Sequence, residues 1–284
     1  MRTTGAVEDY LKAVYALATQ GEHAVNARLA ERLGVSPPSV SAMVKRLEAE
    51  GLLIRGPLGE LVLTARGEAQ ALRTVRRHRL IETYLYQCLG VPWDEVHDEA
   101  EVLEHVISDR LEARIAAVLG HPTHDPHGDP IPPKDGTHQE RWPQPLGITP
   151  EGSRFLVQRV SNRDPKVLRY LGELGIRPGT VLHVETRSPF EGPLWVRVDE
   201  ERHALGDVLV RSIFGSLDQS QQDASLGKRS TRDTTPVTDD PRSRAGGDVP
   251  AAPLRKRLTV RRRETGPPTS AARPRRVWRG EVRG

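Results

Sequence analysis

The chain of 284 residues has little cysteine, few aromatic residues and no long apolar run. Its one cysteine, Cys88, excludes a disulfide bond within the chain. No apolar stretch approaches the ~20 residues that cross a bilayer, and the N-terminal residues lack the hydrophobic segment of a secretory signal. We therefore expect a protein of the reducing cytoplasm with no membrane-spanning segment. The length allows two or three small domains, each with its own core.

The formal net charge of +4 conceals two parts of opposite charge. Residues 216–284 contain 16 Lys and Arg against 8 Asp and Glu, whereas residues 1–215 contain 26 against 30. The C-terminal part is rich in Pro, Gly, Ser and Arg, so burial of its few apolar side chains cannot offset the entropy lost on ordering. We expect a disordered basic tail over residues 216–284. Such a tail either adds non-specific affinity for DNA phosphates or is a solvated appendage.

The N-terminal part has the pattern of a small DNA-binding domain. Apolar residues at helical spacing predict three helices, over residues 4–19, 26–33 and 37–50. Ser36 followed by Pro37 is typical of a helix N-terminus. The stretch LLIRGPLGELVLT then predicts a β-hairpin with a Gly-Pro-Leu-Gly turn. Helix, turn, helix and hairpin together indicate a winged helix-turn-helix over residues 1–64; the alternative is a helical core with a surface hairpin and no DNA-binding role.

Small polar residues on the third predicted helix form a candidate DNA-binding face. They lie opposite the apolar positions Val40, Met43, Val44 and Leu47. Hydroxyl groups can contact base edges or phosphates, a methyl group can contact a thymine methyl, and a lysine can pair with the DNA backbone. An arginine on the hairpin is a further candidate for a phosphate contact. The predicted DNA contacts are Ser36, Pro38, Ser39, Ser41, Ala42, Lys45 and Arg55.

The middle of the chain predicts a helical domain. Thr64 is placed to cap a long helix over residues 65–89, and a further helix is predicted from Pro92 through Ser108 to Leu119. Long helices with an apolar stripe after a winged helix are typical of dimerisation. Residues 121–147 are rich in Pro, Gly and His and lack periodicity, which predicts a loop and linker. We expect a helical dimerisation domain over residues 65–140.

The last folded part changes to β periodicity. A short helix over residues 165–174 is followed by the alternating runs VLHVETR, PLWVRVD and DVLVRSIF, which are separated by Gly and Pro turns. These runs predict strands of a small domain like a β-barrel over residues 148–215. The fold class expected for the whole chain is therefore mainly α with small β parts.

The stretch VHDEAEVLEHVIS, residues 96–108, carries side chains that can bind a metal ion. At about 100° per residue, His97, Glu101, Glu104 and His105 share one helical face.

The preceding helix places His78 and Glu82 one turn apart, and Asp9 lies near the apolar side of the first helix. Carboxylates and imidazoles without a thiolate suit Mn(II) or Fe(II) better than Cu(I) or thiolate-bound zinc. The alternative is a solvated acidic face that forms salt bridges with Arg110 and Arg114.

Four stretches resemble the diphtheria toxin repressor family of metal-dependent transcriptional regulators. They are LAERLGVSPPSVSAMVKRLEAEGLL, LVLTARGEAQALRTVRRHRLIETYL, VHDEAEVLEHVISD and HGDPIP, in the order of that family's winged helix, dimerisation helices and SH3-like domain. The resemblance spans residues 4–215. It implies a homodimer that binds double-stranded DNA at a palindromic operator when loaded with metal and represses metal-uptake genes.

The resemblance also implies two metal sites. The primary site is carried over to Asp9, Glu101, Glu104 and His105, with His78 close by. Asp9 and Glu101 match the manganese-responsive branch of the family, so Mn(II) is expected and Fe(II) is the alternative. Lys12 stands where a compact manganese regulator has a second carboxylate on the first helix.

The ancillary site is carried over to residues of the long helix, the following helix, the loop and the third domain. Its expected ligands are Glu82, His97, Asp125, His127 and Asp164.

Two other functions compete with this interpretation. His97-Asp98 imitates the HD dipeptide of metal-dependent phosphohydrolases, although the sequence has no second HD-type constellation and no phosphate-binding glycine loop. A winged-helix regulator that does not respond to metal is the other alternative.

Overall fold

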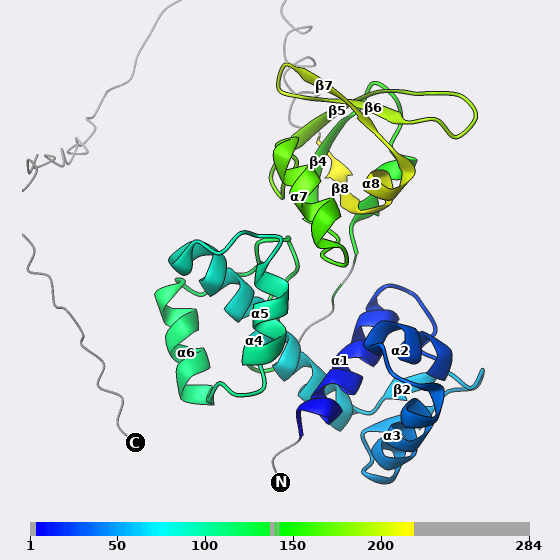
Figure 1. Cartoon of the computed structure of the whole chain (residues 1–284), viewed down its shortest axis with the longest axis vertical. Helices are drawn as coiled ribbons and strands as arrows, with labels where there is room; N and C mark the ends of the chain where they lie inside the picture. Colours follow the sequence, from blue (N-terminus) through cyan, green and yellow to red (C-terminus); the bar gives the residue numbers. More distant parts are fainter. Residues whose placement is uncertain (1–3, 137–139, 141, 219–284) are drawn as a thin grey trace, which may run out of the picture. The chain divides into compact units, whose positions relative to one another are not determined.

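The structure is a computed structural model that describes residues 4–136, 140 and 142–218 (Figure 1). The expected disordered tail therefore lies, from residue 219 onward, outside the described residues. No helix in the described part of the chain is long and apolar enough to cross a membrane.

The N-terminal domain contains the predicted helix-turn-helix and wing. Helices α1 (Gly5–Thr19), α2 (Asn26–Leu33) and α3 (Pro37–Ala49) precede the antiparallel strands β1 (Leu53–Arg55) and β2 (Leu61–Leu63). Gly34 ends α2 with φ 63°, a left-handed conformation that glycine adopts without strain. The Ser36 hydroxyl then accepts a hydrogen bond from the backbone N–H of Ser39 and caps α3.

The core of this domain consists of the residues that the apolar periodicity selects. Leu11, Leu29 and Leu47, one from each helix, are completely buried. Their burial stabilises the domain by about 1.5–3 kcal/mol for each side chain. Because these residues face inward, the opposite face of α3 is left for contacts with other molecules.

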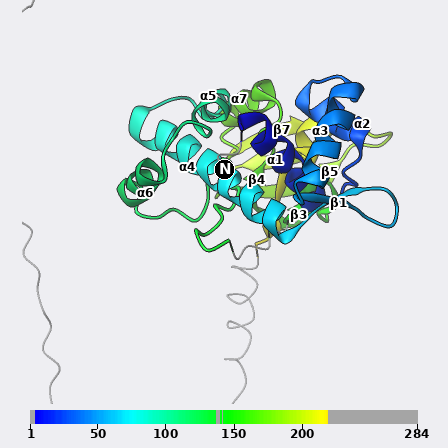
Figure 2. The ribbon, with the colours of Figure 1, turned by 90° about the horizontal axis from the view of Figure 1, so that it is seen from below.

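Helix α4 (Ala65–Leu89) has the predicted bounds. The Thr64 hydroxyl accepts a hydrogen bond from the Gly67 N–H at its start, and Gly90 in a left-handed conformation ends it. Both views of the ribbon show α4 as a single unbroken helix (Figures 1 and 2). Its buried positions include polar side chains, and these build the site described below.

The prediction of one helix from Pro92 to Leu119 is wrong. The structure has two helices, α5 (Val96–Leu103) and α6 (Asp109–Val118), separated by a turn. Ser108 adopts an extended conformation, and its hydroxyl accepts a hydrogen bond from the Leu111 N–H. A serine that caps a new helix in this way terminates the preceding one.

The C-terminal domain is an SH3-like, six-stranded antiparallel sheet with the strand order β3-β8-β4-β5-β6-β7. Its core includes Phe155, Leu182, Val196 and Ile213, all completely buried. The elements are β3 (Gln144–Pro145), the 3-10 helix η1 (Leu146–Ile148), β4 (Arg154–Val160), α7 (Pro165–Glu173), β5 (Val181–Arg187), β6 (Leu194–Val198), β7 (Glu201–Leu205), α8 (Asp207–Arg211) and β8 (Ile213–Leu217).

Two of the three predicted strands, β5 and β6, are confirmed, but the run DVLVRSIF is only partly a strand. Its first five residues form α8, where Asp207 and Arg211 pair across one helical turn at 2.8 Å. An apolar run of this length fits a short helix as well as a strand, so periodicity could not separate the two. β8 also extends to Leu217, two residues beyond the expected end of the domain at 215.

Candidate metal centre

Helix α4 places a histidine and a glutamate in a buried position. His78 is 6% exposed and Glu82 is completely buried. The His78 ring lies between two carboxylates, with Nε2 at 2.9 Å from Glu82 Oε1 and Nδ1 at 2.5 Å from Glu104 Oε2. Burial alone would lower the pKa of His78, but Glu82 and Glu104 outweigh it and raise the pKa to about 10. His78 is therefore an imidazolium at neutral pH, with both ring nitrogens donating.

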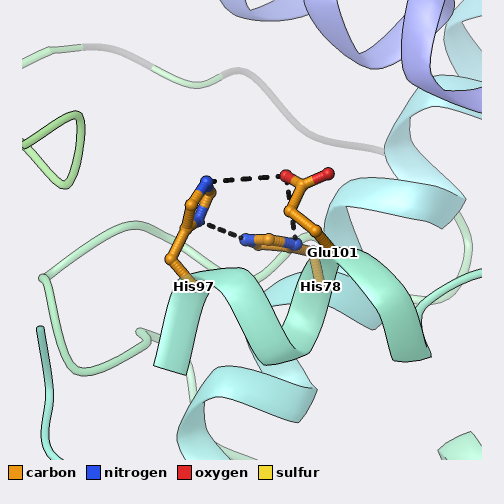
Figure 3. Close-up of side chains that lie close together, drawn as sticks. All are labelled: His78, His97 and Glu101. Atoms are coloured by element: carbon orange, nitrogen blue, oxygen red, sulfur yellow. Dashed lines mark hydrogen bonds and ion pairs between the residues drawn. The ribbon is translucent and has the colours of Figure 1, made fainter. Parts of the chain in front are cut away.

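A first group of ligand-type side chains forms around His78 (Figure 3). Its other members, His97 and Glu101, come from α5. His97 Nδ1 lies 3.0 Å from His78 Nε2, and His97 Nε2 lies 3.5 Å from Glu101 Oε1. One ligand atom from each residue lies within 4.8 Å of the others, close enough for a shared metal ion.

A second group joins α1 to the turn that follows α5. It consists of Asp9, Glu104 and His105, again with ligand atoms within 4.8 Å of one another. His105 Nε2 lies 2.9 Å from Asp9 Oδ1 and 3.5 Å from Glu104 Oε1. Burial raises the pKa of Asp9 despite the neighbouring His105 and Lys12. A cation between these residues would link the winged helix to the helical domain.

A third group lies at the buried side of α4 and is completed by the loop after α6. Its residues are Glu82, Asp125 and His127, none more than 7% exposed. His127 Nε2 lies 2.7 Å from the Trp93 carbonyl oxygen, to which it donates, so that Nδ1 faces Glu82 Oε2 at 3.8 Å. Hydrogen bonding of the outer ring nitrogen to a carbonyl is typical of histidines that bind metal.

Three buried atoms of this third group have no hydrogen-bond partner among the described residues. They are Glu82 Oε2, Asp125 Oδ2 and His127 Nδ1. Buried polar atoms of this kind cost about 1–3 kcal/mol each unless a partner satisfies them. Because each residue of the group contributes one of these atoms, a divalent cation bound among them would satisfy all three at once. The residues therefore fit a metal ion.

The expected primary set thus falls into two adjoining groups. His78 and Glu101 lie in the first, and Asp9, Glu104 and His105 lie in the second. The expectation that Glu104 and His105 lie on the same helix as Glu101 is wrong, because α5 ends at Leu103. The side chains of Glu104 and His105, in the turn after this helix, still lie beside Asp9 in the second group.

The expected ancillary set is brought together only in part. Glu82, Asp125 and His127 form the third group, but His97 lies in the first group with His78. Asp164 is in none of the three groups of the described residues. Its carboxylate instead accepts a hydrogen bond from the Lys166 N–H at 2.9 Å and caps α7. The third domain therefore uses Asp164 for capping in this structure.

Two residues of α1 that sequence reasoning did not include as ligands contact the centre. Glu8 Oε2 lies 2.7 Å from His105 Nδ1. Lys12 Nζ lies 2.7 Å from Glu101 Oε1 and 2.6 Å from Glu104 Oε1. Burial would lower the pKa of Lys12, but Glu104 and Glu101 raise it, so the ammonium stays charged. Glu101 and Glu104 of this acidic stretch therefore pair with Lys12 and His78, whereas Asp98 and Glu99 are exposed.

Helix α3 exposes most of its predicted DNA-binding residues. Pro38, Ser39, Ala42 and Lys45 are exposed, while Val40 is completely buried on the opposite face. An exposed row of small side chains lets a helix approach base edges closely.

The remaining candidates for DNA contact also have partners within the domain. The Ser36 hydroxyl caps α3, and the Ser41 hydroxyl accepts a hydrogen bond from Asn26 at 3.2 Å. Arg55 on β1 pairs with Glu48 at 3.0 Å while its side chain stays 49% exposed. Ser41 and Arg55 would have to give up or share these contacts to reach DNA.

The sequence matches three family descriptions in this order along the chain. Residues 2–59 match the iron dependent repressor N-terminal DNA binding domain, and residues 64–133 match the iron dependent repressor metal binding and dimerisation domain. Residues 144–217 match the FeoA domain. The iron-dependent repressor IdeR of Mycobacterium leprae is 46% identical over 192 residues, which are 63% of this chain and 83% of that protein.

The chain belongs to the diphtheria toxin repressor family. A diphtheria toxin repressor from Corynebacterium glutamicum is 42% identical over 187 residues, 62% of this chain and 82% of that protein. Among solved structures, a manganese-dependent transcriptional repressor in complex with manganese is 41% identical, with a TM-score of 0.70, and covers 75% of this chain and 100% of its own. The manganese regulator SloR is 32% identical, with a TM-score of 0.65, and the match covers 77% of this chain and 100% of SloR.

Membership of the diphtheria toxin repressor family decides between the competing functions. Its members are DNA-binding transcriptional repressors and not enzymes, so the phosphohydrolase alternative is excluded. The chain is a metal-dependent transcriptional repressor with a DNA-binding domain and a metal-binding and dimerisation domain. Relatives named for iron and structures named for manganese both match it, so membership does not select the metal.

Proposed function

We propose that the chain is a Mn(II)-responsive repressor of metal-uptake genes, which acts in the cytoplasm as a homodimer on a palindromic operator. Fe(II) is the alternative metal. The observation that carries the proposal is the second group, in which Asp9 of the DNA-binding domain lies 2.9 Å from His105 of the helical domain. A metal held by these residues would act directly on the position of the DNA-binding helices.

The choice of Mn(II) rests on the ligand chemistry. All candidate ligand atoms in the three groups are carboxylate oxygens or imidazole nitrogens. Hard oxygen ligands favour Mn(II) over softer metals, whereas thiolates would favour zinc or Cu(I). Asp125 contributes a further carboxylate to the third group. Selection among divalent ions then depends on geometry and availability, because raw affinity alone favours zinc over Mn(II).

Exposed apolar residues of α5 and α6 support the homodimer. Val102, Leu111 and Val118 are 69%, 48% and 69% exposed. A second copy of the same face would bury them, as isologous dimers do. Two copies of α3 related by a two-fold axis would read two half-sites of opposite direction, which is why a palindromic operator is proposed.

The proposed switch is a linkage between metal and DNA binding. When bound, the metal supplies a positive charge shared by ligands from α1 and from the end of α5. With Asp9 on one side of the metal and Glu104 and His105 on the other, metal binding would favour one position of α3 relative to the dimerisation helices. Operator affinity rises by the same factor as metal affinity, typically about 5- to 150-fold.

The test is operator affinity, measured by fluorescence anisotropy under anaerobic conditions, in titrations with Mn(II), Fe(II) and Zn(II). We expect Mn(II) to tighten binding in the wild type, and Glu101→Ala and His105→Ala to lose this effect while keeping the circular dichroism spectrum. His121→Ala, at an exposed loop position, is the control that keeps the full response. Equal DNA affinity of the wild type with and without each of the three metals contradicts the proposal, and a response to Fe(II) without one to Mn(II) selects the other metal.

A further inference from the structure

Lys12 occupies the place where the first and second ligand groups meet. Its ammonium lies 2.7 Å from Glu101, a member of the first group, and 2.6 Å from Glu104, a member of the second. The Lys12 side chain is 17% exposed and that of Glu104 is completely buried. One tethered cation therefore already pairs with a carboxylate from each group.

The same face of α1 supplies both a ligand and this cation. Asp9 and Lys12 are three residues apart, so they are neighbours on one side of the helix. Asp9 reaches His105, while Lys12 reaches α5 and the turn behind it. The contact between α1 and these residues consequently has a positive charge of its own before any metal ion binds.

The position of the Lys12 ammonium limits how many divalent ions the two groups can hold. The ammonium pairs with one oxygen of Glu101 and with one oxygen of Glu104, so it occupies the place where the first and second groups adjoin. A second divalent ion would have to bind beside this ammonium or displace it from both oxygens. Repulsion between two such cations is strong in a half-buried site, because the surroundings screen it poorly.

We propose that Lys12 is a built-in cation of the metal centre, which takes the place of a second divalent ion and holds α1 against the end of α5 in the metal-free protein. The inference rests on the proposed function, because it presumes that the first and second groups bind metal. It differs from an ordinary salt bridge in one respect: the ammonium limits the number of metal ions bound.

The number of Mn(II) ions bound per chain tests this limit. We would follow free Mn(II) by electron paramagnetic resonance during titration of the wild type, Lys12→Gln and Lys12→Glu. Both variants are expected to bind one more equivalent than the wild type. At saturating Mn(II) the third group contributes the same number of ions to all three proteins, so the difference reports on Lys12. Lys166→Gln, at an exposed position of α7, is the matched control with the wild-type number.

Thermal unfolding in the presence of a chelator tests the second half of the proposal without any metal. Lys12→Gln leaves the buried Glu104 without its ammonium partner, and we expect a midpoint lower by about 5 °C or more. Lys12→Arg keeps a cation and is expected to stay closer to the wild type. Saturating Mn(II) is expected to raise the midpoint of Lys12→Gln by more than that of the wild type.

Two results overturn the inference. One is the same number of Mn(II) ions for the wild type and both titration variants. The other is an unchanged midpoint for Lys12→Gln in chelator. A wild type that binds no Mn(II) refutes the proposed function instead, and the unfolding experiment still decides whether Lys12 holds α1 in place.

Discussion

Metal binding to the first group is expected to release a proton, because His78 is charged in the metal-free protein. Burial would lower the pKa of His78, but Glu82 and Glu104 raise it to about 10. A metal can bind an imidazole nitrogen only after the proton has left. At pH 7 the ring is three pH units below this pKa, so about one molecule in a thousand is neutral. At about 1.4 kcal/mol per unit, displacing the proton costs about 4 kcal/mol of metal-binding free energy.

The sign of the pH dependence follows from this proton. As the pH rises from 6 toward the pKa of His78, the proton leaves more easily and the apparent association constant for Mn(II) increases about tenfold per pH unit. His127 adds a similar dependence to the third group, because Glu82 raises its pKa to about 9 although burial acts in the opposite direction. Operator binding at limiting Mn(II) is expected to weaken as the pH falls.

Isothermal titration calorimetry measures the effect directly. The heat of Mn(II) binding at pH 7 is compared between two buffers with different ionisation enthalpies, and the difference gives the number of protons released. We expect at least one proton per chain. His121→Gln, at an exposed position, is the control with an unchanged number. Release of less than half a proton, or an affinity that does not vary between pH 6 and 9, would refute the charged state of His78 or its role as a ligand.

Two further predictions concern the macromolecular contacts. Lys45→Ala is expected to weaken DNA binding across all sequences and to lower the slope of log affinity against log salt by about one unit. Ser39→Ala is expected instead to change the preference between operator sequences. Equal salt slopes for the wild type and Lys45→Ala argue against a phosphate contact. Val102→Asp on α5 is expected to shift the protein toward monomers in light scattering, with Val208→Asp on α8 as a control of similar exposure; an unchanged mass places the dimer interface elsewhere.

The three ligand groups form a connected system rather than separate sites. Glu82 contacts His78 and His97 with one oxygen and faces His127 with the other. Glu104 joins His78 to the second group in the same way. Removing or adding charge at one group therefore changes the proton affinity of the next, so the titration behaviour belongs to the cluster and not to single residues.

The sequence by itself determined the elements that local signals define. Thr64 and Gly90 bound α4, and Ser36-Pro37 starts α3, because caps and turn residues act over a few neighbours. The sequence also shows which residue types could bind a metal ion, and helical periodicity predicts the exposed face of α3. Apolar periodicity predicted one helix over residues 92–119, but Ser108 is a residue type that caps helices, and in the structure it starts α6.

Only the tertiary structure decided how the ligand-type residues combine. Lys12 and Glu101 are 89 positions apart, and no local pattern states that their side chains meet. The packing of α1 beside the end of α5 places the Lys12 ammonium between two carboxylates, and the loop after α6 brings His127 to Glu82. Asp164, although placed near a helix end by the sequence, is used to cap α7. The charge balance of the centre thus depends on contacts between distant elements, whereas the residue types available to it are fixed by the chain.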